Sequence, residues 1–277
     1  MNFIDAHSHV WTPDTERYPL AAGFRRANMD PPSFTTSELS QQAIPVGVSR
    51  VVLIQMSFYG YDNSYMLDAI AKHPEMYRGV AVIDQEETSA VATMLELKKK
   101  GVRGFRIYPK DRPLDRWLSS DGMRAMWKCG GEQNLAMCCL MDVDGLPALD
   151  RTCNEFPETP VVIDHMCRIG VTGQIVPDEV QRLCNMARHK KVTVKVSAFY
   201  ALGQKQPPYG DLAPLIKRLY DAFGPERLMW ASDAPFQVVG GHSYKASINL
   251  IQSGLNFLKQ ADLDCLLRKT AENVFFH

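Results

Sequence analysis

Short apolar runs alternate with amphipathic stretches along the whole chain, and this alternation limits the fold more than any other feature. Runs of strand length lie at residues 2–7, 50–56, 78–83, 102–107, 135–141, 160–165, 192–197 and 227–231. Helical spacing of apolar residues follows over 63–73, which starts with an Asn-Ser cap signal, and over 88–100 and 211–223. Eight strands that alternate with helices predict an α/β fold, a (β/α)8 TIM barrel that spans residues 1–277 as a single domain.

An open, doubly wound sheet is the alternative interpretation of the same pattern. It is disfavoured because no Gly-x-Gly-x-x-Gly or Walker A loop follows an early strand. Two irregular segments, residues 11–34 and 201–210, fall on the C-terminal face of a barrel, where active sites are built. We weigh two roles for these segments equally, lids over a site and surface decoration.

Charge and cysteine content exclude several classes of protein. The chain has 31 basic and 31 acidic residues, so it shows no basic footprint for nucleic acid or an anionic membrane. Its seven cysteines include no Cys-x-x-Cys pair, which predicts reduced, buried thiols and no thiolate zinc site. We find neither a signal-peptide pattern nor an apolar run of membrane-spanning length. We therefore expect a cytoplasmic protein whose partner is a small molecule.

The strongest chemical signal is the sequence Asp5-Ala6-His7-Ser8-His9 at the first strand. Residues two apart on a strand point to the same face, so His7 and His9 project together at the barrel mouth. Two such imidazoles are well placed to hold one metal ion.

Two later strands end in residues of the same kind. The sixth run leads to His165, and the eighth leads to Asp233. The alternatives are a core histidine that hydrogen-bonds to backbone and an aspartate that caps the next helix. Because four such residues stand at the ends of three strands, we interpret His7, His9, His165 and Asp233 as one site.

These motifs resemble the amidohydrolase superfamily, and within it the amidohydrolase-related branch of lactonases and decarboxylases. Residues 223–233 form a long and specific match, and segments 55–63, 78–81 and 101–106 are similar to 2-pyrone-4,6-dicarboxylate lactonase and its relatives. The resemblance spans residues 3 to about 275. It implies a hydrolase that opens a small, carboxylate-bearing lactone. The alternatives are a non-oxidative decarboxylase of aromatic or unsaturated acids and a non-catalytic binding protein.

The resemblance also implies roles for the site residues. Asp233 takes a proton from the attacking water, and His165 is the second catalytic residue. One divalent metal ion, with zinc as the first choice, would bind to His7, His9, His165 and Asp233. The fifth run ends in Leu140-Met141-Asp142, without a further ligand, so we expect no binuclear site. Related lactonases work without metal, and this metal-free mode stays open.

Four residues are predicted to bind substrate. Arg106 ends the fourth run and suits a substrate carboxylate, because its guanidinium is a planar fork. Arg168, Ser57 and Tyr59 lie near other strand ends. The alternative for each arginine is a surface ion pair, and the alternative for Lys195 is a structural pair with a carboxylate. The oligomeric state is open, with a homodimer among the options.

Overall fold

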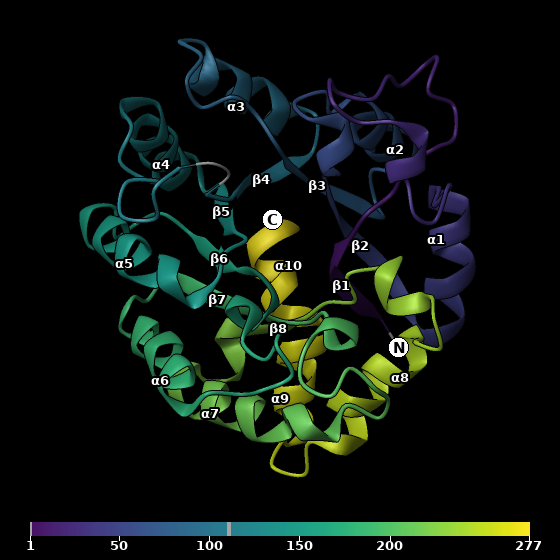
Figure 1. Ribbon diagram of the computed structural model, residues 1–277, viewed down its shortest axis with the longest axis vertical. Coiled ribbons are helices and arrows are strands. Elements are labelled where there is room, and N and C mark those ends of the chain that lie inside the picture. Colours follow the sequence, from purple (N-terminus) through teal and green to yellow (C-terminus); the bar gives the residue numbers. More distant parts are fainter. Residues whose placement is uncertain (1, 110–111) are drawn as a thin grey trace.

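The eight apolar runs form one sheet of parallel strands that pair in the order of the chain (Figure 1). The computed structural model describes residues 2–109 and 112–277. The strands are β1 (Phe3–Ser8), β2 (Val48–Ile54), β3 (Tyr77–Ala81), β4 (Val102–Ile107), β5 (Ala136–Cys139), β6 (Val161–Ile163), β7 (Val192–Val196) and β8 (Leu228–Trp230). A parallel bridge between Ser8 and Ala234 joins the segment that follows β8 to the end of β1. The predicted barrel is confirmed, and the open sheet is wrong.

Helices surround the strands in Figure 1. They are α1 (Thr36–Ala43), α2 (Ser64–Lys72), α3 (Ala90–Lys99), α4 (Asp121–Gln133), α5 (Leu146–Glu155), α6 (Pro177–Asn185), α7 (Ala213–Phe223), α8 (Tyr244–Asn249), α9 (Gln260–Asp264) and α10 (Thr270–Phe275). The last helix differs from the others, because Ala271 and Phe275 share a buried cluster with Ile4 and Val52. This cluster fills the barrel interior, so α10 covers one end of the barrel (Figure 1).

Several strands end two residues before the predicted position, and one of these ends lies where the site begins. The fourth strand covers the expected residues 102–107, whereas the sixth, expected over 160–165, ends at Ile163. The chain leaves the sheet there because the following residues adopt left-handed backbone angles. His165 therefore follows the strand instead of lying on it.

The expected cap of α2 has another function. Within the described chain, the Asn63 side chain makes no capping hydrogen bond to this helix. Its Nδ2 donates to the carbonyl oxygen of Val82 at 2.9 Å, and its Oδ1 accepts from the Val82 N–H at 3.1 Å. Asn63 therefore ties the start of α2 to the end of β3.

Two expectations about composition can be compared with the structure. The seven cysteines are free and most are buried, as predicted. Among the described residues, no helix combines the length and the apolar character that crossing a membrane requires.

Candidate active site

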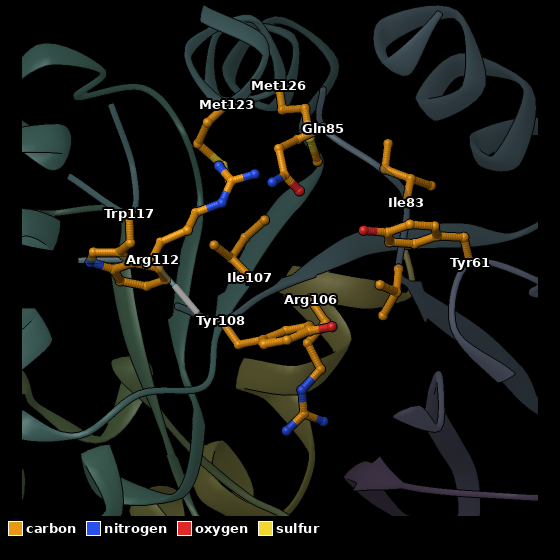
Figure 2. A pocket seen from close by; sticks show the side chains of 11 residues that line it. Tyr61, Ile83, Gln85, Arg106, Ile107, Tyr108, Arg112, Trp117, Met123 and Met126 are labelled. Carbon is orange, nitrogen blue, oxygen red and sulfur yellow. The ribbon is translucent and has the colours of Figure 1, made fainter. Parts of the chain in front are cut away.

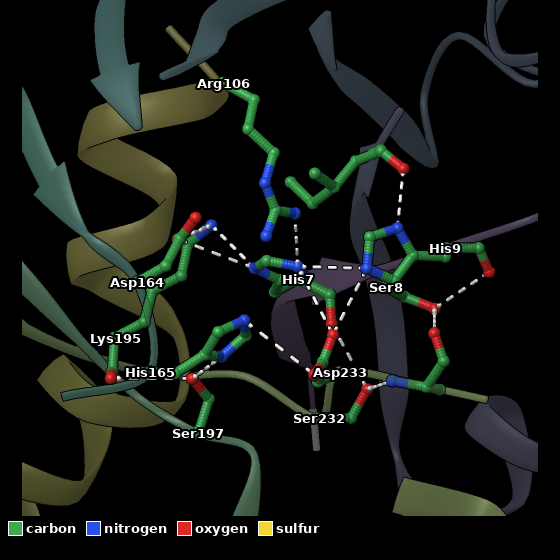
Figure 3. Close-up of polar contacts among 12 residues, drawn as sticks. His7, Ser8, His9, Arg106, Asp164, His165, Lys195, Ser197, Ser232 and Asp233 are labelled. Carbon is green, nitrogen blue, oxygen red and sulfur yellow. Dashed lines mark hydrogen bonds and ion pairs between the residues drawn. The ribbon is translucent and has the colours of Figure 1, made fainter. Parts of the chain in front are cut away.

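The ends of β1, β6 and β8 bring the four predicted residues into one cluster (Figure 3). His7 Nε2 lies 3.3 Å from His9 Nε2. Asp233 Oδ1 lies 3.2 Å from His9 Nε2 and 3.4 Å from His7 Nε2. His165 Nε2 lies 3.8 Å from Asp233 Oδ2. All four residues are buried, so their charges and protons interact strongly.

The turn that carries His165 has an uncommon backbone conformation. Residues 165–168 are not glycines, yet all have φ angles between 50° and 56°. Left-handed geometry of this kind is unfavourable by about 1–2 kcal/mol for each L-residue. Residues held in such conformations cluster at functional sites, where the surroundings enforce them. The turn directs the His165 ring toward Asp233, whose own φ is 68°.

Hydrogen bonds on the far side of two imidazoles determine where their protons lie. His9 Nδ1 is 2.8 Å from the carbonyl oxygen of Ile54, which can only accept, so Nδ1 carries a proton. His165 Nδ1 is 2.9 Å from Ser197 Oγ, and this hydroxyl donates to the Lys195 carbonyl oxygen at 3.5 Å. His165 Nδ1 is therefore also a donor. In the neutral rings, both Nε2 atoms direct lone pairs toward Asp233.

The two oxygens of Asp233 have different surroundings. The Tyr200 hydroxyl donates to Oδ2 at 2.7 Å. Oδ1 is buried and has no hydrogen-bond partner among the described residues. A buried carboxylate oxygen that faces lone pairs is unfavourable unless a cation or a proton lies between them. This arrangement fits a cation site.

A metal ion suits the donor set. Ligand atoms of His7, His165 and Asp233 lie within 4.8 Å of one another, and all three residues are buried. Imidazole nitrogens and one carboxylate are the ligands that zinc and similar divalent ions prefer. The group could therefore hold a metal ion, with His9 Nε2 as a neighbour on the same side of Asp233.

Burial and charge determine the protonation of the cluster. Burial lowers the pKa of His7 well below its ordinary value of 6.5, and it lowers the pKa of His165 as well. Burial alone would raise the pKa of Asp233, but the imidazoles of His165 and His7 outweigh it and hold that pKa well below 3.8. At neutral pH the site therefore contains an ionised carboxylate next to neutral imidazoles.

Lys195 is more central to the site than its sequence context indicates. It is fully buried on β7, with Nζ 3.0 Å from Asp164 Oδ1 and 3.2 Å from His7 Nδ1. Burial opposes ionisation of Asp164, but Lys195 and His7 hold its pKa well below the ordinary value. The available sequence signal was weak: Lys195 and Ser197 are two polar residues on one face of an apolar run.

Asp5 connects the two strands that supply His7 and Asp233. Its carboxylate accepts hydrogen bonds from the Ser232 N–H at 2.8 Å, the Ser232 hydroxyl, the Tyr244 hydroxyl at 2.8 Å and the His7 N–H at 3.1 Å. These four hydrogen bonds oppose the effect of burial only in part, because burial still raises the pKa of Asp5 to about 6. The Asp-x-His-x-His pattern signalled Asp5, whereas no motif signalled Tyr244 on α8.

A cavity of about 790 Å³ opens onto the cluster. His9, Arg106, His165 and Asp233 line it, so these side chains are accessible to a ligand. Arg106, at the end of β4, places Nη1 3.3 Å from His7 Nε2 and brings positive charge next to the cluster (Figure 3). A volume in this range is typical of sites for small organic ligands.

Of the other three residues predicted to bind substrate, two line the cavity and one does not. Ser57 lines the cavity, and so does Arg168, which pairs with Asp142 through a contact of 3.0 Å. Tyr59 is not among the described residues that line the cavity; its hydroxyl accepts from the Thr12 N–H at 3.2 Å. In this structure Tyr59 therefore supports the loop that contains Thr12.

Both irregular segments form walls of the cavity. Ala21, Ala22 and Phe24 come from the first segment, and Ala201 and Leu202 come from the second. The first segment is pinned at its base, since Trp11 and Phe34 exchange backbone hydrogen bonds of 2.8 and 3.2 Å. These segments therefore belong to the site.

Comparisons with known proteins agree with this architecture. The sequence profile of a family described as amidohydrolase matches residues 4–276. The L-fucono-1,5-lactonase of Burkholderia ambifaria is 26% identical over 249 residues, which cover 86% of this chain and 82% of that protein. The 2-pyrone-4,6-dicarboxylate hydrolase of Comamonas testosteroni is 28% identical over 248 residues, which cover 86% of this chain and 78% of that protein.

A solved structure supports the fold independently. An amidohydrolase from Burkholderia multivorans, crystallised with bound zinc, matches with a TM-score of 0.85 over 100% of this chain and 99% of that chain. At 18% identity this likeness shows the fold alone. The profile match, by contrast, extends over almost all of the sequence and includes every residue of the cluster. The chain therefore belongs to the amidohydrolase 2 family.

Proposed function

We propose that this protein is a hydrolase that opens a small, carboxylate-bearing lactone by attack of water at the barrel mouth. The observation that carries the proposal is the Asp233 carboxylate, which is ionised and lines a cavity, and whose Oδ1 has no hydrogen-bond partner among the described residues. Relatives that are lactone hydrolases, at 26% and 28% identity, support the same class of reaction.

The chain's own residues supply the proton transfers. A water molecule next to Asp233 Oδ1 gives its proton to this carboxylate as its oxygen attacks the lactone carbonyl carbon. Tyr200 donates to Oδ2 and so keeps Oδ1 directed at the water. When the ring C–O bond breaks, protonated Asp233 returns the proton to the departing alkoxide. The product is a hydroxy acid, and its new carboxylic acid releases a proton near neutral pH.

Positive charge near the carbonyl stabilises the tetrahedral oxyanion. A zinc ion held by His7, His165 and Asp233, next to His9, would polarise the carbonyl and lower the pKa of a bound water. In the metal-free mode, the Arg106 guanidinium polarises the carbonyl instead. Arg106 is also the candidate for binding the substrate carboxylate, with Ser57 and Arg168 as further contacts from the cavity wall.

An acid-release assay tests this function. Purified protein is mixed with a panel of lactones and a pH indicator, and we compare wild type with Asp233→Asn. We expect a loss of roughly 10²- to 10⁴-fold in the variant, which is the usual contribution of a general base. Asp144→Asn is the matched control, because this exposed carboxylate pairs only with Arg182 in the described contacts.

Metal content is measured on the same samples. We expect about one zinc per chain and loss of activity with a chelator; full activity without metal would establish the metal-free mode. Wild-type turnover in Asp233→Asn would refute the mechanism. If no lactone in the panel releases acid, and an unsaturated carboxylic acid loses its ultraviolet absorbance when the protein is added, the decarboxylase is favoured.

A further inference from the structure

The cavity is larger than a small lactone ring requires. Its volume of about 790 Å³ lies in the range of sites that enclose drug-sized ligands. The reactive groups, His9, Arg106, His165 and Asp233, form only one part of the lining. A substrate larger than one lactone ring would therefore contact the remaining walls as well.

These remaining walls are mostly apolar. They include side chains from the segments that follow five different strands: Phe24, Met56, Leu140, Leu202 and Phe236. Phe24 is 38% exposed although it is a large apolar residue at the cavity. An apolar surface of this kind, next to a polar reaction centre, is typical of a ligand-binding wall.

Few polar side chains remain outside the catalytic cluster to bind a ligand. Among the described lining residues, Gln55 Nε2 donates to the carbonyl oxygen of Asp62 at 2.6 Å, and Arg168 pairs with Asp142. Ser57 and the hydroxyls of Tyr61, Tyr108 and Tyr200 complete this set, and the Tyr200 hydroxyl already donates to Asp233 Oδ2. If a ligand carried a hydroxyl on each ring carbon, several of these ligand hydroxyls would find no hydrogen-bond partner in the cavity.

A side pocket of about 60 Å³ continues from the cavity and shares Arg106 and Tyr108 with it (Figure 2). Arg106 directs its guanidinium away from Arg112 (Figure 2). Ile107 and Trp117 line the side pocket, and Arg112 is paired with Glu86 at 2.8 Å. The side pocket is therefore more polar than the main cavity, its own cation is already neutralised, and the apolar walls belong to the main cavity.

We propose that the substrate carries an extended alkyl or aryl group on its lactone ring, and that the walls select this group over polyhydroxylated lactones. This inference rests on the proposed hydrolase function. Transfer of one methylene from water to an apolar wall corresponds to about a fourfold gain in kcat/KM. Each hydroxyl that loses water without gaining a partner lowers kcat/KM by roughly 5- to 150-fold.

A matched substrate series tests the inference. The lactones share one five-membered ring and one carboxylate, and they carry an alkyl chain of increasing length. A glucaro-1,4-lactone, which has the same ring and a carboxylate but carries hydroxyls, is the comparison. We expect kcat/KM to rise about fourfold for each added methylene over the first members of the series. A flat response, or faster turnover of the hydroxylated lactone, would overturn the inference and leave the hydrolase function intact.

Two variants locate the effect in the cavity. Leu140→Asn should reduce the gain per methylene, because Leu140 lines the cavity at the end of β5. Leu114→Asn is the matched control; this leucine is 39% exposed and is not among the described lining residues, so the gain should stay as in wild type. If the gain in kcat/KM per methylene were the same in both variants, Leu140 would not belong to the wall that binds the alkyl group.

Calorimetric binding of the same series to wild type separates this inference from the function. If no lactone is hydrolysed but Kd falls about fourfold for each methylene, the hydrolase proposal fails and the apolar selection stands. If neither turnover nor Kd responds to chain length, the apolar selection fails.

Discussion

Replacement of Lys195 by methionine should strongly destabilise the fold. Methionine keeps a chain of similar length but removes the charge that faces Asp164 at 3.0 Å. Both side chains are fully buried, and neither carboxylate oxygen of Asp164 has a hydrogen-bond partner among the described residues. The variant therefore leaves a buried charge without its cationic partner, and the neutral His7 imidazole at 3.5 Å offsets little of the loss, which costs about 3–5 kcal/mol of unfolding free energy.

Urea unfolding followed by circular dichroism measures this loss, and the midpoint of thermal unfolding should fall by roughly 10 °C. Lys217→Met is the matched control: its partner Asp221 is 52% exposed, so we expect a change of about 0.5 kcal/mol or less. The double variant Lys195→Met with Asp164→Leu should recover most of the lost stability, because an apolar pair replaces the ion pair. The reasoning is refuted if Lys195→Met and Lys217→Met lose the same stability, or if the double variant is only as stable as the sum of its single changes.

Two further predictions concern catalysis. Tyr200→Phe removes the donor to Asp233 Oδ2 and should lower kcat roughly 10- to 150-fold with little change in KM; a change in thermal midpoint alone would show a merely structural role. The kcat/KM profile should be flat between pH 7 and 8, because Asp233 is ionised and burial lowers the pKa values of His7 and His165 below 6.5. A fall in activity centred between pH 7 and 8 would contradict this protonation, whereas a fall near pH 6 would report Asp5, whose pKa burial raises to about 6.

Local patterns in the sequence were sufficient for the barrel and for the centre of the site. Burial of apolar residues requires alternating strands and helices to pack in layers, and the alternation is visible without any knowledge of contacts. The His7 and His9 pair follows from the two-residue period of a strand. The ends of parallel strands meet at one face of a barrel, which is why His165 and Asp233 could be assigned to the same place.

Tertiary structure alone decided which polar side chains support this centre. Lys195 contacts His7 from 188 positions away, and Tyr200 reaches Asp233 from a loop, so no spacing rule connects them. The left-handed turn that carries His165 opposes the local preference of L-residues, and the surrounding packing holds it. Tyr59 follows a strand as Ser57 does, yet its hydroxyl accepts a hydrogen bond from the Thr12 N–H. The direction of such side chains depends on which neighbours exclude water, and that is settled only when the chain has closed into a barrel.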